Sequence, residues 1–337
     1  MEKRTLVLVN GFLGAGKTTL LIAAANLLHA RGRRAALITN DQGEELVDTR
    51  MARAAGVPAA EVGGGCFCCR FSDFLRSMAA LEEHHPEVIF AEPVGSCTDL
   101  AGTLIEALRG RFALAPLTVL VDPARARELL APDADPDMAW LFRQQLAEAD
   151  IACFTRADLH ADFPQLPGSA PRRLSAVTGE GVAEWLEETL AGERTAGAHP
   201  LDIDYTRYAQ AEAALGWLNW RVDLRLARAL TPAAVVGLLL EAFGGGLPIA
   251  HLKVFNAASG GYVKASVCRA GEEPLVDGRL DLPPVRRHEL VINLRARAAP
   301  EELEAAAARA VRALGGRAAF LRRESFRPAA PRKLLLS

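Results

Sequence analysis

No apolar run in this chain approaches the roughly 18 residues that a helix needs to cross a bilayer. The first residues, 1–9, contain basic residues and a short apolar stretch, but that stretch continues directly into a glycine-rich loop, so we expect no signal peptide. Acidic and basic residues nearly balance, at 41 and 39, which gives no electrostatic case for a nucleic acid or an anionic membrane as partner. We therefore expect a cytoplasmic protein.

Cysteines are few, six in 337 residues, which is too sparse for a disulfide framework in a chain of this length. Three of the six stand within four positions, at Cys66, Cys68 and Cys69, and clustered thiols of this kind are more typical of metal or redox chemistry. The sequence also has no internal repeat and no low-complexity tract. Its length predicts two domains rather than one.

Apolar, β-branched runs alternate with helical stretches through the first half of the chain. The first run, Thr5–Asn10, ends at a glycine, and Thr18–Ala30 then has helical spacing and an Ala/Leu composition. Strands that alternate with helices indicate an α/β fold, in which a parallel sheet is covered on both faces. Further strands are expected at Ala35–Thr39, Val88–Ala91, Leu117–Val121 and Ile151–Thr155, and helices at Phe71–Glu83, Leu100–Arg109 and Trp140–Ala149.

The order of elements changes after residue 191, where the chain becomes richer in glycine and charge. We expect a first domain at 1–191, a linker at 192–211, a smaller α+β domain at 212–321 and a poorly ordered tail at 322–337. The smaller domain is expected to be an antiparallel sheet with helices on one face. Its expected strands are Leu218–Leu226, Ala250–Asn256, Tyr262–Arg269 and Glu289–Ala296, and its expected helices are Thr231–Phe243 and Pro300–Leu314.

A phosphate-binding pattern, G-x-x-x-x-G-K-[ST], occupies residues 11–18, between the first strand and the first helix. Its glycines let consecutive backbone N–H groups point at phosphate oxygens, and the helix dipole adds attraction. Lys17 should reach the β- and γ-phosphates and Thr18 should place its hydroxyl on Mg²⁺. This motif predicts a P-loop NTPase domain whose nucleotide-binding residues include Gly11, Gly14, Ala15, Gly16, Lys17, Thr18 and Thr19.

Glu92 and Gly95 follow the strand at Val88–Ala91. An acidic residue at the end of this strand is placed to hold Mg²⁺, directly or through water, and Gly95 would let an amide approach the γ-phosphate. Glu92 joins Lys17 and Thr18 as the predicted catalytic residues.

The base-binding site is predicted at Thr155, Arg156 and Asp158, which follow another strand. An aspartate here accepts hydrogen bonds from guanine, and an arginine can stack on the base as lysine does. Ser175 and Ala176 resemble the start of a loop that closes over guanine. These elements favour GTP over ATP, although a chance loop acid and a chance Ser-Ala pair are the plain alternative.

Cys66, Cys68 and Cys69 follow a run of glycines that lets the backbone wrap around an ion. Thiolates favour soft or borderline ions such as Zn²⁺ or Cu(I), and a structural Zn²⁺ site needs four ligands. This cluster offers three thiols at most, so it leaves the coordination of the ion incomplete. Incomplete coordination suits an ion that is passed on to another protein. A redox switch or inert packing are the alternatives. Asp41 and Glu44 lie where a switch segment would sit, and their carboxylates could join the metal ligands or be merely solvated.

Taken together, the motifs resemble those of the CobW and CobW-like metallochaperone GTPases, which are related to the UreG and HypB nickel-insertion GTPases. The resemblance rests on G-F-L-G-A-G-K-T-T at 11–19, N-D-x-G at 40–43, G-G-C-x-C-C at 64–69, E-P-x-G at 92–95 and T-R-A-D at 155–158. Arginine stands at 156 where the family usually has lysine. The sequence after Gly95 departs from the common E-x-x-G-x-A-D-P, and no histidine-rich tail is present.

This likeness implies slow GTP hydrolysis with Mg²⁺, coupled to the binding and delivery of a transition metal, with Zn²⁺ as the default ion. It implies a client metalloprotein or cofactor-biosynthesis enzyme as partner, and a homodimer is possible. Two other functions stay open. One is an ATP-dependent phosphotransferase with structural or redox cysteines, and the other is a non-enzymatic, nucleotide-gated metal sensor.

Overall fold

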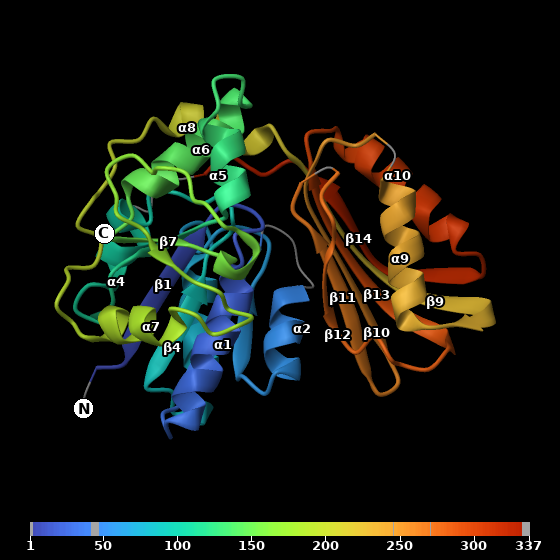
Figure 1. Ribbon diagram of the computed structural model, residues 1–337, viewed down its shortest axis with the longest axis horizontal. Helices are drawn as coiled ribbons and strands as arrows, with labels where there is room; N and C mark the ends of the chain where they lie inside the picture. Colours follow the sequence, from blue (N-terminus) through green and yellow to red (C-terminus); the bar gives the residue numbers. More distant parts are fainter. Residues whose placement is uncertain (1–2, 42–46, 245, 270, 332–337) are drawn as a thin grey trace. The chain divides into compact units, whose positions relative to one another are not determined.

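The computed structural model describes residues 3–41, 47–244, 246–269 and 271–331 (Figure 1). The chain divides into two compact units, one made mainly of the residues up to Ala211 and the other of Glu212–Ala329. Within the described residues, none of the helices combines the length and the apolar character that crossing a membrane requires.

A parallel sheet forms the centre of the first unit, with the strand order β3-β2-β4-β1-β6-β7-β8 and β5 beside β1. β1 lies between β4 and β6, and all of its pairings are parallel. Its side chains are almost all buried, which explains why an apolar, β-branched run without alternation forms this strand. The strands are β1 (Thr5–Gly11), β2 (Ala35–Asn40), β3 (Ala59–Val62), β4 (Val88–Glu92), β5 (Ala113–Leu114), β6 (Thr118–Val121), β7 (Ile151–Phe154) and β8 (Arg172–Arg173).

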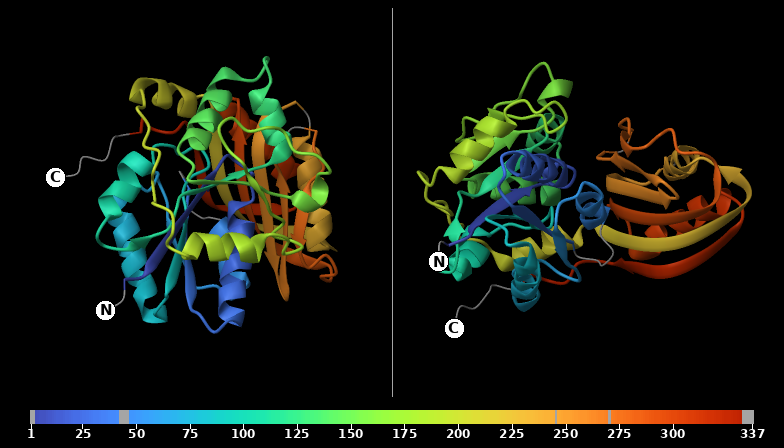
Figure 2. Two further views of the ribbon diagram at one scale, coloured as in Figure 1. Left: turned by 60° about the vertical axis from the view of Figure 1, so that its left-hand side comes forward. Right: turned by 90° about the horizontal axis from the view of Figure 1, so that it is seen from below.

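Helices cover both faces of this sheet, as expected for an α/β fold (Figure 2). α1 and α7 share one apolar core with the sheet, in which Leu21 and Trp185 pack with Val7 and Phe90. The α-helices are α1 (Lys17–Ala30), α2 (Val47–Ala54), α3 (Phe71–Ala80), α4 (Glu106–Leu108), α5 (Pro123–Leu130), α6 (Pro136–Ala147), α7 (Val182–Leu190) and α8 (Tyr205–Ala213). Short turns of other helix types are η1 (Leu81–His84), η2 (Ala101–Ile105) and η3 (Ala157–Leu159).

The second unit is a six-stranded antiparallel sheet in the order β12-β11-β10-β13-β9-β14. α9 and α10 pack on one of its faces, where Leu239 and Leu303 join Trp220 and Ile292 in a single core. Its elements are β9 (Gly216–Leu230), α9 (Pro232–Phe243), β10 (Ile249–Ala258), β11 (Gly261–Val267), β12 (Leu275–Gly278), β13 (Val285–Ala296), α10 (Pro300–Ala313) and β14 (Arg317–Phe326).

Three segments differ from the sequence-based expectations. The predicted linker ends in a helix, α8, and the predicted tail begins inside β14, which pairs with β9 up to Phe326. The sequence of β14 does not predict a strand, because this edge strand contains charged residues and lacks a regular alternation of apolar and polar side chains. The predicted helix Leu100–Arg109 starts instead as a π-helical turn, η2, before a short α4.

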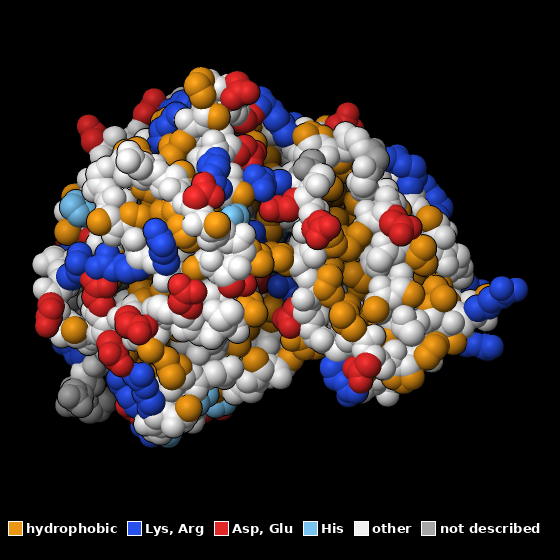
Figure 3. All heavy atoms as spheres, in the orientation of Figure 1, with side chains coloured by type: hydrophobic (Ala, Val, Ile, Leu, Met, Phe, Trp, Pro, Cys, Tyr) orange, Lys and Arg blue, Asp and Glu red, His pale blue; other side chains and the backbone are white. Residues whose placement is uncertain are grey.

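The surface of the second unit carries exposed apolar side chains beside polar ones (Figure 3). The larger exposed ones include Leu238 of α9, Leu275 and Val276 of β12, and Phe320 and Leu321 of β14.

Candidate nucleotide and metal site

The phosphate loop lies at the carboxyl end of β1, the edge of a parallel α/β sheet where ligands usually bind. A Cβ at Gly11 would lie 2.4 Å from the Leu120 carbonyl oxygen of β6, so the neighbouring strand requires glycine at this position. Gly16 adopts the left-handed conformation, with φ of 84°, and α1 begins at the next residue. The Lys17 ammonium lies inside the loop, 2.8 Å from the Gly11 carbonyl oxygen. The first amides of α1 and this ammonium are therefore placed to receive an anion.

Two carboxylates converge on the Thr18 hydroxyl. Thr18 Oγ1 lies 2.8 Å from Glu92 Oε2 and 2.9 Å from Asp48 Oδ1, and all three side chains are buried. A hydroxyl has a single hydrogen, so it can donate to only one of the two carboxylates at a time. A hydroxyl with two buried carboxylate oxygens beside a phosphate loop is a donor set that suits Mg²⁺.

Glu92 was predicted from the sequence, but Asp48 was not. Asp48 lies in the acidic stretch where a switch segment is expected, but the ligands that the sequence predicts from this stretch are Asp41 and Glu44. Asp48 belongs to the first turn of α2, and this helix directs it to Thr18. Glu44 lies outside the described residues, and Asp41 donates its backbone amide to the Val62 carbonyl oxygen.

Gly95 packs directly against the phosphate loop. A Cβ at this position would lie 2.8 Å from the Leu13 side chain and 3.1 Å from the Leu13 backbone nitrogen. The structure therefore brings Gly95 to the loop at which its amide could approach a γ-phosphate.

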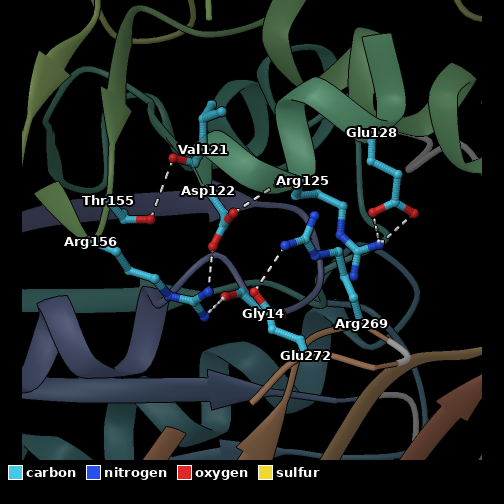
Figure 4. Close-up of polar contacts among 9 residues, drawn as sticks. All are labelled: Gly14, Val121, Asp122, Arg125, Glu128, Thr155, Arg156, Arg269 and Glu272. Atoms are coloured by element: carbon cyan, nitrogen blue, oxygen red, sulfur yellow. Dashed lines mark hydrogen bonds and ion pairs between the residues drawn. The ribbon is translucent and has the colours of Figure 1, made fainter. Parts of the chain in front are cut away.

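Arg156 connects the predicted base-binding segment to the phosphate loop (Figure 4). Its guanidinium donates to the Gly14 carbonyl oxygen at 2.8 Å and forms an ion pair with Asp122, which also caps α5. Arg156 itself has a φ of 55°, in the left-handed region. Two contacts thus fix the guanidinium, whereas a lysine ammonium is a single point charge without this planar fork.

The two predicted base-reading elements lie side by side. The Ala157 amide donates to the Leu174 carbonyl oxygen at 3.0 Å, next to Ser175, and the Ser175 amide donates to the Glu180 carbonyl oxygen at 2.9 Å. Asp158 is exposed beside this loop. Residues 155–158 and 174–180, far apart in the sequence, are therefore neighbours in the fold.

The cysteine loop, residues 63–70, is held by Asn40 at the end of β2. The Asn40 amide donates to the carbonyl oxygens of Val62 at 2.7 Å and Gly65 at 2.8 Å, and its oxygen accepts from the Phe67 amide at 3.0 Å. These three bonds hold the loop from both sides.

Cys66 Sγ accepts a hydrogen bond from the Cys69 amide at 3.4 Å. Cys66 is buried, Cys68 is half-buried and Cys69 is exposed. Within the described ranges, no three His, Cys, Asp or Glu side chains are gathered closely enough to hold an ion. The predicted ligand set therefore stays a prediction.

The other three cysteines are buried. Burial raises the pKa of the Cys153 thiol to about 12, so this residue of β7 is unreactive at neutral pH. Cys97 lies in the segment after Gly95, and its carbonyl oxygen accepts from Asn10 and Gln145.

A buried polar network behind the site was missed in the sequence. Gln145 Nε2 donates to the carbonyl oxygens of Gly95 at 3.1 Å and Cys97 at 2.9 Å. Glu148 accepts from the Leu100 amide at 2.7 Å, and burial raises the pKa of its carboxyl to about 8. Both residues belong to a segment predicted only as a helix, and their partners are backbone groups that no local pattern reveals.

The family model described as CobW/HypB/UreG, nucleotide-binding domain, matches residues 5–178. The chain is similar to the zinc chaperone CobW of Pseudomonas aeruginosa, with 28% identity over 248 residues, covering 63% of this chain and 62% of that protein. It is also similar to the zinc chaperone YjiA of Escherichia coli K12, with 29% identity over 177 residues, covering 49% of this chain and 53% of that protein. The chain thus spans less than two thirds of the length of these curated relatives.

Two solved structures are also similar to the chain. Zn(II)-bound YjiA GTPase from E. coli matches with a TM-score of 0.35 and 17% identity, covering 91% of this chain and 99% of that one. HypB from Helicobacter pylori in complex with nickel matches with a TM-score of 0.43 and 16% identity, covering 60% of this chain and 92% of that one.

Proposed function

Because this chain belongs to the CobW/HypB/UreG family, we propose that it binds and hydrolyses GTP with Mg²⁺ and couples this reaction to the binding and delivery of a transition metal, with Zn²⁺ as the default ion. One observation carries the proposal. Asn40 of β2 holds the cysteine loop, and its neighbour Thr39 contacts Thr49 of α2 at 2.6 Å, next to the Asp48 carboxylate on Thr18. A change at the nucleotide thus has a short path to the thiols.

In this proposal each nucleotide-binding residue has one task. Lys17 and the amides of the loop neutralise the β- and γ-phosphates, and Gly95 approaches the γ-phosphate from the opposite side. Asp158 accepts the hydrogen bonds of guanine, while Arg156 holds the base-binding segment against Gly14. Hydrolysis then depends on positioning and electrostatics more than on a protein base.

Thr18, Asp48 and Glu92 are the residues that would hold Mg²⁺. Their buried oxygens fit a hard divalent cation, which would neutralise charge on the phosphates when bound. Thr18 lies in the first turn of α1, Asp48 in the first turn of α2 and Glu92 at the end of β4, so three different elements supply these oxygens.

The transported metal is assigned to Cys66 and Cys68, with Cys69, Asp41 and Glu44 as further candidate ligands. Three thiols are fewer than the four ligands of a structural Zn²⁺ site, which suits a cargo site, since an ion that must be released should not be fully enclosed. We further propose a client metalloprotein or cofactor-biosynthesis enzyme as recipient, and a reducing compartment such as the cytoplasm, which would keep the thiols free.

A titration of Zn²⁺ into the reduced, metal-free protein, with and without Mg²⁺-GTP, tests this function. A Cys66/Cys68/Cys69→Ala variant should lose Zn²⁺ binding, and the Cys268→Ala variant is the matched control, since this thiol lies in the second unit. We expect GTP to shift the affinity of the wild-type protein for Zn²⁺. Equal binding by the triple variant would overturn the metal assignment.

A nucleotide assay tests the other half of the proposal. We expect GTP to bind more tightly than ATP and to be turned over slowly. Preference for ATP would instead favour a phosphotransferase, and tight GTP binding without turnover would favour a nucleotide-gated sensor.

A further inference from the structure

One continuous segment of chain touches both functional sites. At the beginning of the 95–105 segment, a Cβ at Gly95 would lie 2.8 Å from the Leu13 side chain of the phosphate loop. Towards its end, Thr103 Oγ1 lies 3.2 Å from Cys68 Sγ. The segment therefore lies between the predicted γ-phosphate position and the predicted metal ligands.

Buried side chains fix the first half of the 95–105 segment. Gln145 donates to the Gly95 carbonyl oxygen, and Glu148 accepts from the Leu100 amide, while both side chains are fully buried. Loss of these bonds in the buried interior would be costly. Because Gln145 and Glu148 lie at the end of α6 and at its C-cap, a displacement of Gly95 that keeps both bonds must move Leu100 as well.

The second half of the segment has an irregular backbone. Asp99 has a φ of 60°, unusual for a residue with a side chain, and Ala101–Ile105 forms a π-helical turn. The Tyr205 hydroxyl donates to the Asp99 carboxylate, and the Thr103 hydroxyl donates to the Asp99 carbonyl oxygen. Such conformations are costly and persist only where the surroundings determine them, which often happens at functional sites.

Thr103 has one hydroxyl hydrogen, and the Asp99 carbonyl oxygen already receives it. In the contact with Cys68, the thiol is therefore the donor and Thr103 Oγ1 the acceptor. A thiolate that coordinates a metal has no hydrogen to donate. When Cys68 coordinates an ion, this hydrogen bond must therefore be lost, or reversed by turning the Thr103 hydroxyl from Asp99 to the sulfur.

We propose that Thr103 is a positioning residue for the metal site, which holds Cys68 in its metal-free arrangement and releases it according to the nucleotide bound at Gly95. The proposal rests on the proposed function, because it needs a nucleotide at the phosphate loop. It names the regulation of the cysteine site, with the 95–105 segment as the connecting element.

The test compares Thr103→Val, which keeps the shape of the side chain and removes the hydroxyl, with Thr103→Ser, which keeps the hydroxyl. Thr189→Val is the matched control, because Thr189 is equally buried and its hydroxyl has no partner among the described residues. The reduced, metal-free proteins are alkylated with iodoacetamide in the presence of Mg²⁺ and either GDP or a non-hydrolysable GTP analogue. Fragmentation of the labelled peptide separates Cys68 from exposed Cys69, the internal reference.

We expect the alkylation rate of Cys68, relative to Cys69, to differ between the two nucleotides by about threefold or more in the wild-type protein, the scale of one neutral hydrogen bond. Thr103→Ser and Thr189→Val should keep this ratio. In Thr103→Val, the ratio of the relative Cys68 alkylation rates with the two nucleotides should be close to one, while the affinity for nucleotides is unchanged. An unchanged ratio in Thr103→Val overturns the proposal.

The same proteins, titrated with Zn²⁺, separate this inference from the proposed function. GTP-dependent Zn²⁺ affinity that survives in Thr103→Val leaves the metal chaperone function intact and overturns the role of Thr103. Absence of Zn²⁺ binding in the wild-type protein removes the proposed cargo, while nucleotide-dependent alkylation of Cys68 still supports the connection through Thr103.

Discussion

Asp48 Oδ1 lies 2.9 Å from the Thr18 hydroxyl, which also lies 2.8 Å from Glu92 Oε2. This contact brings the start of α2 to the phosphate loop and makes Asp48 a stronger candidate for the Mg²⁺ site than Asp41.

Asp48→Asn should raise the Mg²⁺ concentration needed for half-maximal GTP hydrolysis by about tenfold or more, because loss of one unit charge beside a divalent ion typically costs over 1 kcal/mol. Asp41→Asn should change this concentration much less. The measurement is the Mg²⁺ dependence of phosphate release. A larger effect of Asp41→Asn would return the role to the residue chosen from the sequence alone.

Asp158 determines the base in the proposed site. Asp158→Asn exchanges one acceptor oxygen for a donor, so it should weaken GTP binding by about 10–100-fold, as expected when buried hydrogen bonds to a ligand are lost. Xanthosine triphosphate carries an oxygen in place of the exocyclic amine of guanine, and it should bind the variant better than it binds the wild-type protein. Competition against a fluorescent nucleotide measures both effects. Parallel losses for both nucleotides would contradict direct contact with the base.

Arg156 should act through its contacts with Asp122 and Gly14. Arg156→Met keeps an apolar stem but loses both, so GTP affinity should fall by about tenfold. Arg156→Lys can reach one of the two partners and should retain most of the affinity. Calorimetric measurement of GTP binding by the two variants distinguishes these outcomes. If both variants bind GTP as tightly as the wild-type protein, the guanidinium is dispensable.

The sequence was most informative where function depends on consecutive residues. The phosphate loop, Glu92 with Gly95 and the segment around Asp158 each follow a buried strand, and parallel strands bring their carboxyl ends to one edge. Local patterns were enough to predict the fold class of the first domain. The Ala157 amide donates to the Leu174 carbonyl oxygen, so the two predicted base-binding segments lie side by side, while their contact with guanine stays a prediction.

Contacts across long sequence separations were not predictable. Gln145 and Thr103 are ordinary helix positions in the sequence, and their partners are a distant backbone carbonyl group and a distant thiol. Nor could composition distinguish Asp48 from its acidic neighbours, since its role depends on the start of α2. β14 was missed because an edge strand whose second half contains Arg322, Arg323 and Glu324 resembles a solvated tail.

Glu148 provides a prediction about stability and pH. Its carboxyl is buried, and burial raises its pKa from the ordinary 4.5 to about 8, although hydrogen bonds from the Leu100 and Ala101 amides and the Thr98 hydroxyl oppose this shift. Between these two values the folded protein holds a proton that the unfolded chain has released. The contribution of Glu148 to stability is therefore complete below the unfolded pKa and is lost as the pH rises through the folded pKa.

Glu148→Gln removes this titration, so the difference in thermal midpoint between the wild-type protein and the variant should shift in favour of the variant from pH 5.5 to pH 8.5. The glutamine places an amide group near Asn10 and Thr98, which adds a cost that does not depend on pH and cancels in this comparison. Glu128→Gln is the control, since this carboxylate pairs with Arg125 at a more exposed position. If the midpoints of Glu148→Gln and the wild-type protein fall in parallel across this range, the carboxyl is ionised throughout. The buried network that holds Gly95 would then contain a permanent negative charge, and its hydrogen-bond donors would be the reason why α6 tolerates it.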